Sequence, residues 1–437
     1  MNSMNQLWIK NMQPLSELIK YKKPRQKNKI YIKYLFLFTL ISGFFVPYIP
    51  EYYRYDVIRG SVLLLFLIYF LINKHHFDFI SKVIILFSLY ILIMALVTYI
   101  KYNVYSTVAF KIFISSIYYI IGYNFINTKD NMLYLSKIYF LGFFILVSVI
   151  ILLNILGVKP INLYTNMEEV YLGSQGVNTT KLIPFFIFPS ILYFLYARNV
   201  KNRITILVIV TISIILMMIA QKRGAVLGLG FGIMTYLFLS PRKGKIFNIV
   251  TAIFVISLIS YPLYIDTVIT TWEVRKDRFS VLMDPNDAAL QKEQRYIEVQ
   301  RTINDFMDRS ALEILAGTGF KSELYRYDTN RIVHTDYIMF LDGTGALGLF
   351  IYIFIYILIF YKTRKYSRYF KNDSFILNIY AIVISMTVAI LFTAISGSSH
   401  SLDIKAVYFL YVGAALGFFS NNFSQKYGHK NAYNNIR

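Results

Sequence analysis

The 437-residue chain contains no cysteine. A disulfide framework and a catalytic thiolate are therefore excluded, and cysteine usage gives no information on the cellular compartment. Charged residues are also scarce, at 16% of the chain, whereas hydrophobic residues make up 57%. With a mean hydropathy of +0.51, this composition excludes an ordinary soluble domain and is typical of a protein with many membrane-spanning segments.

Patterns that would identify a metal or nucleotide site are missing as well. No His, Cys or carboxylate cluster has metal-ligand spacing, and there is no Ser-His-Asp pattern or phosphate-binding glycine loop. Gly343-Thr-Gly-Ala-Leu-Gly348 matches G-x-G-x-x-G in letters, but it lies at the start of an apolar segment instead of in a βαβ unit. We therefore predict no cofactor and no metal.

The net charge of +22 raises the question of nucleic acid as a partner. The basic residues lie mostly in short loops beside apolar segments, which is the distribution of a membrane protein and not of a basic binding face. We therefore predict contact with membrane lipid and no nucleic-acid partner.

Twelve apolar runs are long enough to cross a hydrocarbon core of roughly 30 Å, which takes about 20 helical residues. They are apolar on all sides, which favours helices over the alternating strands of a β-barrel. The sequence thus predicts an all-α polytopic membrane bundle of about 12 transmembrane helices. The expected spans are 30–50, 57–73, 80–100, 104–126, 133–157, 181–197, 203–220, 224–240, 246–265, 335–361, 375–396 and 402–420.

The distribution of Lys and Arg orients this bundle. With a cytoplasmic N-terminus, the inner loops contain most of the basic residues and the short outer loops contain few. Merging 203–240 into one helix would move the basic cluster 362–371 to the outer side, so twelve spans with both termini cytoplasmic is preferred. The expected parts are a cytoplasmic tail 1–29, spans one to nine in 30–265, an outer loop 266–334, spans ten to twelve in 335–420 and a cytoplasmic tail 421–437.

The outer loop 266–334 is the main polar interruption, with ten Lys/Arg and twelve Asp/Glu residues. A protein that only spans the bilayer would connect its helices with short turns, so we expect the chemistry to lie here. Between 291 and 315, apolar residues recur at helical spacing among charges, which predicts one or two amphipathic helices over the mouth of the bundle. The topology places this loop, the 158–180 loop and the Lys222-Arg223 turn on one side.

Three arginines and one histidine on this side are candidate site residues. Arg223 either anchors a helix end at the interface or binds a phosphate through its planar guanidinium. Arg295 and Arg301 have a solvated helix face as the ordinary alternative. His334, the only histidine in the loop, stands at the start of an apolar segment near Asp336. A neutral imidazole there can accept a proton or have a structural role.

Glycines recur every four residues at Gly224, Gly228 and Gly232. One face of the predicted helix is then bare, and a neighbouring helix can approach it closely. We interpret this repeat as helix packing.

Several of these short patterns together resemble the bacterial O-antigen polymerase and O-antigen ligase superfamily. Ala220-Gln-Lys-Arg-Gly-Ala225 resembles its S-R-G-A turn, although Lys222 replaces the usual Ser. The family's outer loop and following helix have an Arg on a loop helix, a G-x-G, an H-N-x-[YF] and an acidic residue before G-x-x-G. The similar order here, within residues 200–360, is Arg295, Gly317-Thr-Gly319-Phe320, His334-Thr-Asp-Tyr337 and Asp342-Gly-Thr-Gly-Ala-Leu-Gly348, with Thr335 in place of the usual Asn.

The resemblance implies a GT-C-like fold in the bacterial cytoplasmic membrane and a polyprenyl-diphosphate-linked oligosaccharide as donor. The glycan is transferred to an acceptor hydroxyl without a metal. By this resemblance Arg223 and Arg295 hold the diphosphate, Arg301 competes with Arg295 for that role, and His334 removes the acceptor proton. A chain-length regulator protein is a further expected partner.

Polymerisation of lipid-linked repeat units is the first interpretation of this chain, and a glycan ligase is the near alternative. A flippase for lipid-linked oligosaccharides, or another transporter, belongs to a different class and would have ionisable residues along a central path within its helices. The apolar segments here are almost free of charge, with Lys111 as the main exception. A purely structural or sensory membrane protein is the third option, and it is disfavoured because no soluble signalling domain is present. The sugar, its linkage and the final polymer stay open.

Overall fold

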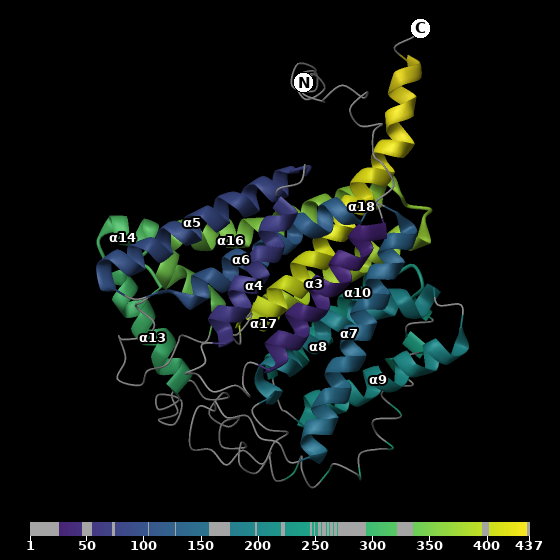
Figure 1. The fold of residues 1–437 in the computed structure, drawn as a ribbon, viewed down its shortest axis with the longest axis horizontal. Coiled ribbons are helices and arrows are strands. Elements are labelled where there is room, and N and C mark those ends of the chain that lie inside the picture. The colour runs from purple at the N-terminus through teal and green to yellow at the C-terminus, as the bar shows by residue number, and fades with distance from the viewer. Residues whose placement is uncertain are drawn as a thin grey trace.

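The computed structural model describes residues 26–45, 55–71, 75–156 without 104 and 127, 175–244 without 197–198 and 220–222, single positions between 247 and 269, and 294–320, 335–395 and 402–434. Across these residues the regular structure is helical and contains no strand (Figure 1), which confirms the all-α prediction. The helices are α3 Gln26–Phe45, α4 Tyr55–Leu71, α5 Phe79–Tyr102, α6 Thr107–Phe125, α7 Lys129–Ile155, α8 Gln175–Tyr196, α9 Val200–Ile219, α10 Arg223–Leu239, α13 Gln294–Met307, α14 Ala311–Ala316, α16 Asp336–Tyr369, α17 Ser374–Ile395 and α18 Leu402–Asn434.

The chain is a multi-pass helical membrane protein. Five of its described helices are long and apolar enough to cross a bilayer. These five spans are Phe79–Tyr102, Lys129–Leu153, Asp336–Tyr369, Ser374–Ile395 and Leu402–Lys426. Shorter apolar helices cover Ile30–Gly43, Ile58–Ile68, Lys181–Tyr196 and Gly224–Leu239. The total of twelve spans stays a prediction.

The bundle has two distinct ends, which the pairing of α5 with α16 defines. These helices are antiparallel, because Asp78 at the start of α5 forms an ion pair with Lys362, far along α16. Tyr90, further along α5, instead donates a hydrogen bond to the carbonyl of Thr344, early in α16. The α5 C-terminus then meets α14, where Lys101 Nζ lies 3.2 Å from Glu313 Oε1. We call this the loop end of the bundle.

The α9 and α10 segments are separate helices, as the sequence predicted. They fold back on each other, because Ile206 of α9 and Tyr236 of α10 line the same cavity. Near the C-terminus of α10, the Tyr236 hydroxyl donates to Asn378 Oδ1, in the second turn of α17. α10 therefore finishes opposite the loop end, whereas α13 and α14 belong to the loop end. The chain must change ends between residues 240 and 294.

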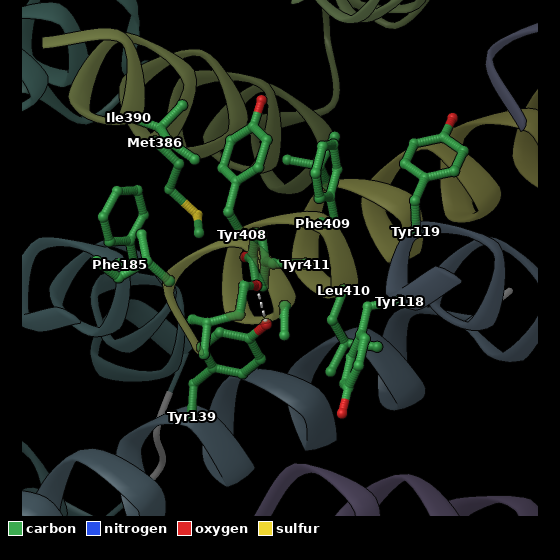
Figure 2. Packing of buried hydrophobic residues seen from close by; sticks show 14 of the residues in the cluster. Tyr118, Tyr119, Tyr139, Phe185, Met386, Ile390, Tyr408, Phe409, Leu410 and Tyr411 are labelled. Atoms are coloured by element: carbon green, nitrogen blue, oxygen red, sulfur yellow. Dashed lines mark hydrogen bonds between the residues drawn. The ribbon is translucent and has the colours of Figure 1, made fainter. Parts of the chain in front are cut away.

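α18 forms the centre of the bundle, since 94% of its most apolar window is buried. It runs parallel to α6 in backbone contact: a Cβ on Gly413 would overlap the carbonyl oxygen of Tyr119, and one on Gly417 would overlap that of Tyr123. The α7 side chain Tyr139 donates its hydroxyl to the carbonyl of Val407 at 2.5 Å (Figure 2). Small residues thus allow the helix backbones to meet, as is common in membrane bundles.

The glycine repeat of α10 packs on α17, which confirms its predicted role. A Cβ on Gly228 would lie 2.9 Å from Thr393 Oγ1 and 3.0 Å from the carbonyl oxygen of Ala389. A Cβ on Gly232 would lie 3.2 Å from the carbonyl oxygen of Ser385. The close approach holds the start of α10 beside the last turns of α17.

Two helices extend beyond the predicted spans. α16 continues to Tyr369 instead of ending at 361, and α18 continues to Asn434 instead of ending at 420. The expected tail 421–437 is therefore helical as far as Asn434. Apolar length predicts where a helix leaves the hydrocarbon, but the helix itself continues until the backbone is broken, and these extensions contain no proline.

Candidate functional site

At the loop end, α16 is broken at Gly345. This residue has φ +64° and ψ −173°, a conformation that is available almost only to glycine. A Cβ there would also overlap the carbonyl oxygen of Leu315. The break frees backbone groups that a continuous helix would pair internally, and such groups require other partners in a membrane protein.

The Gly317-Thr-Gly319 segment supplies partners for this break. Its two glycines have φ of +83° and +89°. The Gly319 amide donates to the carbonyl of Gly343 at 2.9 Å, and a Cβ on Gly317 would lie 2.5 Å from the Gly345 amide nitrogen. The glycine pattern of the loop and that of the helix therefore interlock, and this explains both patterns without a bound nucleotide.

α5 holds this interlock from the side. The Tyr90 hydroxyl is 2.8 Å from the carbonyl oxygen of Ala316 and 2.9 Å from that of Thr344, so it bridges α14 and α16. Thr98 Oγ1 accepts a 2.9 Å hydrogen bond from the Phe320 amide. Figure 1 shows α14 beside α5 and α16 at one edge of the bundle. Together these contacts fix the loop segment 316–320 on two membrane helices.

An ion pair between Arg309 and Asp342 fastens the same segment. Arg309 Nη1 donates to the main-chain carbonyl of Asp342 at 2.8 Å, and Nη2 binds the Asp342 carboxylate. Both side chains are buried, at 4% and 2% exposure. Buried charges are stable only when they are paired and hydrogen-bonded. Asp342, the acidic residue before the glycines of α16, is therefore paired with Arg309. The sequence did not predict this pair.

Two further ion pairs join the first turn of α18 to its neighbours. Lys405 Nζ lies 3.6 Å from Asp336 Oδ2, with the side chains 1% and 0% exposed. The same ammonium is 4.8 Å from the ring centroids of Phe340 and of Tyr352. Arg59 binds Asp403 in a second buried pair. α18 therefore fixes the first residue of α16, two positions after His334.

A weaker contact lies at the surface of the loop end. The ion pair of Lys101 with Glu313, together with a hydrogen bond from Ser310, lowers the pKa of the Glu313 carboxyl. Both partners are more than a third exposed, so solvent screens the pair and it adds little to stability. The buried contacts therefore dominate the docking of α14.

The structure describes the predicted site residues to different extents. Arg301 is exposed on α13, and its helix confirms the amphipathic prediction. Arg223 is the first residue of α10 and Arg295 the second of α13, but their side chains lie outside the described residues. His334 lies outside the described residues altogether.

The described helices still indicate which of these positions share an end. The Tyr337 hydroxyl in α16 donates to the carbonyl of Leu391 in α17 at 3.0 Å. Leu391 lies next to the stretch of α17 on which Gly228 packs. The starts of α10 and α16 are therefore at the same end of the bundle, and α13 is linked to that end through α14.

In the described part of the chain, no group of three or more His, Cys, Asp or Glu residues could hold a metal ion. The chain matches no protein-family model, and no curated protein matches it by sequence. The functional argument accordingly depends on the residues of the loop end.

Proposed function

We propose that the chain is a membrane glycosyltransferase that polymerises polyprenyl-diphosphate-linked oligosaccharide repeat units into a surface polysaccharide, on the outer face of the bacterial cytoplasmic membrane. The observation that carries this proposal is the interlock of Gly317-Thr-Gly319 with the α16 break at Gly345. In this interlock the two glycine patterns that resemble the family, one in the loop and one in α16, pack against each other. It also supports a fixed relation between the loop helix α13 and the segment that enters α16.

The proposed reaction replaces one bond to the anomeric carbon by another. The bond from the sugar to the diphosphate oxygen breaks, the acceptor oxygen forms the new glycosidic bond, and polyprenyl diphosphate leaves. Arg223 and Arg295, with Arg301 as the alternative to Arg295, neutralise the charge that grows on the leaving group. His334 accepts the proton of the acceptor hydroxyl as general base. No metal takes part in this scheme.

The positions of buried charges favour this proposal over a flippase. Arg59, Lys181, Asp336, Asp342 and Lys405 are buried, and each lies within the first two turns of its helix. Four of these described residues, all except Lys181, form the ion pairs that join segments at the loop end. A transport path would instead require ionisable groups through the middle of the bundle.

The matched variants His334→Ala and His76→Ala test the proposal in cells. His76 is exposed and lies in the connection before α5, opposite the loop end. A general base typically raises the reaction rate about 10²–10⁴-fold. Cells with the His334→Ala variant should therefore carry single repeat units on the final acceptor and lose the long-chain ladder. His76→Ala should keep the ladder. Both surface glycan and lipid-linked glycan are profiled by gel electrophoresis.

The same profiles separate the polymerase from the ligase. A ligase variant would accumulate long chains that are still attached to the polyprenyl carrier. Unchanged profiles in both fractions, with the His334→Ala protein present in the membrane, would reject catalysis by His334.

A further inference from the structure

Opposite the loop end, two cations lie over one aromatic ring. Lys129 Nζ is 5.6 Å and Arg242 Cζ is 4.9 Å from the ring centroid of Tyr196. Lys129 Nζ is also 4.8 Å from the ring centroid of Phe375. Each cation is attracted to an aromatic face, but the ring does not neutralise either charge.

Neither cation has a carboxylate within ion-pair distance in the part of the chain that the structure describes. Two acidic residues stand near this cluster in sequence, Asp130 beside Lys129 and Asp373 two positions before Phe375. Asp130 follows Lys129 and is exposed. Asp373 uses Oδ1 to cap α17, where it accepts hydrogen bonds from the amides of Phe375 at 2.9 Å and Ile376 at 3.1 Å. The Lys129–Arg242 pair is therefore available for an anion from outside the chain.

An apolar cavity lies between α8, α9 and α10 in the same half of the bundle. Its volume is about 70 Å³, and it is open on one side. Its lining is aliphatic and aromatic, and the one hydroxyl among these side chains, that of Tyr236, donates to Asn378. Ile191 of α8, Leu207 of α9 and Tyr236 of α10 are among the lining residues.

A short chain of hydrogen bonds connects the cavity to the cations. Asn378 Oδ1 accepts from the hydroxyls of Tyr236 at 2.9 Å and Ser240 at 3.1 Å. Asn378 Nδ2 lies 3.5 Å from the hydroxyl of Tyr196, the residue whose ring both cations contact. The Arg242 amide donates to Ser240 Oγ at 3.2 Å. The apolar cavity and the cation pair are therefore adjacent parts of one site.

We propose that this site binds one membrane phospholipid with an anionic headgroup. Its phosphate contacts Lys129 and Arg242, and part of one acyl chain enters the open cavity between α8, α9 and α10. The two features together define an amphipathic ligand: inorganic phosphate would leave the cavity unused, and an apolar molecule would leave the cations unused. This end is also the one that the charge bias predicts to be cytoplasmic, where anionic lipid attracts basic residues. The site is independent of the proposed reaction.

The test uses the purified full chain in a non-ionic detergent. Phosphatidylglycerol and phosphatidylcholine with identical acyl chains are added separately. For each lipid the thermal unfolding midpoint is measured, and the number of bound lipids is determined by native mass spectrometry. Phosphatidylglycerol should raise the midpoint by a few degrees and should remain bound as a single copy. Each basic residue near a membrane surface contributes about 1 kcal/mol, so Lys129→Gln and Arg242→Gln should each weaken binding about five-fold.

Two sets of variants separate the headgroup from the chain. Lys243→Gln removes a neighbouring exposed cation and should leave binding unchanged. Leu207→Trp and Ile191→Trp fill the cavity from two different helices and should abolish the shift while the cations remain. Equal shifts from both lipids, or a phosphatidylglycerol preference that survives the double variant Lys129→Gln/Arg242→Gln, would overturn the proposal. An equal shift from inorganic phosphate that the cavity variants retain would reduce the site to an anion site and would also overturn it.

Discussion

Arg309 and Asp342 bind each other inside the bundle, 33 positions apart in sequence, and connect the loop segment 309–320 to the membrane helix α16. Arg309 contacts both the carboxylate and the main-chain carbonyl of its partner. Because the Arg309 side chain binds the backbone close to the break at Gly345, it holds the break in place and also neutralises the Asp342 carboxylate. The pair is therefore the main buried contact that holds the loop segment on α16.

Loss of Arg309 should release this segment. Arg309→Ala leaves the Asp342 carboxylate buried without its cation, which typically costs about 3–5 kcal/mol. We expect faster proteolysis within 309–320 in detergent-solubilised protein, with the rest of the bundle resistant. Arg301→Ala, on the exposed face of α13, is the control and should not change the cleavage rate. Equal resistance of both variants to the protease would show that the Arg309–Asp342 pair does not hold the loop.

Replacement of Gly345 should be far more damaging than replacement of a helix glycine in open surroundings. Gly345→Ala imposes a side chain on a positive φ, at about 1–3 kcal/mol, and its Cβ overlaps the Leu315 carbonyl. Gly230→Ala is the matched control, because a Cβ there has no atom within 4 Å and alanine favours a helix. Thermal unfolding should show a lower midpoint for Gly345→Ala and an unchanged or higher one for Gly230→Ala. The reverse order would contradict the described backbone.

The Lys405–Asp336 pair gives a double-variant test. Lys405→Met leaves a carboxylate buried alone and should lower the unfolding midpoint and the amount of protein in the membrane. Adding Asp336→Asn removes the lone charge and should restore most of the loss, because a neutral pair often replaces a buried ion pair without penalty. Additive losses in the double variant would mean that the two side chains do not interact.

The arginines of the proposed diphosphate site should not tolerate lysine. Arg223→Lys and Arg295→Lys keep the charge but lose the planar fork of donors. A charge-assisted hydrogen bond contributes roughly 1.5–3 kcal/mol, so polymer formation should fall about ten- to a hundred-fold. Polymer yield at equal protein level measures the effect, and normal polymer from Arg223→Ala would make that residue a membrane anchor.

Local sequence patterns predicted much of the fold. Apolar length predicted the described helices to within a few residues at most ends, and the Gln221-Lys222-Arg223 turn correctly separated α9 from α10. The four-residue spacing of Gly228 and Gly232 predicted their packing, and the helical spacing within 291–315 predicted α13 and α14. Each of these depends on residues that are close in sequence, where helix periodicity is decisive.

The buried ion pairs that hold the loop end together could not be predicted from local sequence patterns. Arg309 follows an amphipathic helix in a run of charges, and nothing near it indicates a partner 33 positions later. Arg59 and Lys405 are buried within the first two turns of their helices, and no neighbouring residue in the sequence indicates their partners. Such pairs depend on which helices pack together, and composition alone does not determine that packing.

The most direct test of the proposed function is reconstitution of the purified chain with a polyprenyl-diphosphate-linked oligosaccharide, in the presence of a metal chelator. The proposal predicts a ladder of products that differ by one repeat unit, one polyprenyl diphosphate released for each bond formed, and no ladder from His334→Ala. Lipid-linked substrate that stays unchanged with folded wild-type protein, or a ladder of equal yield from His334→Ala, would contradict it.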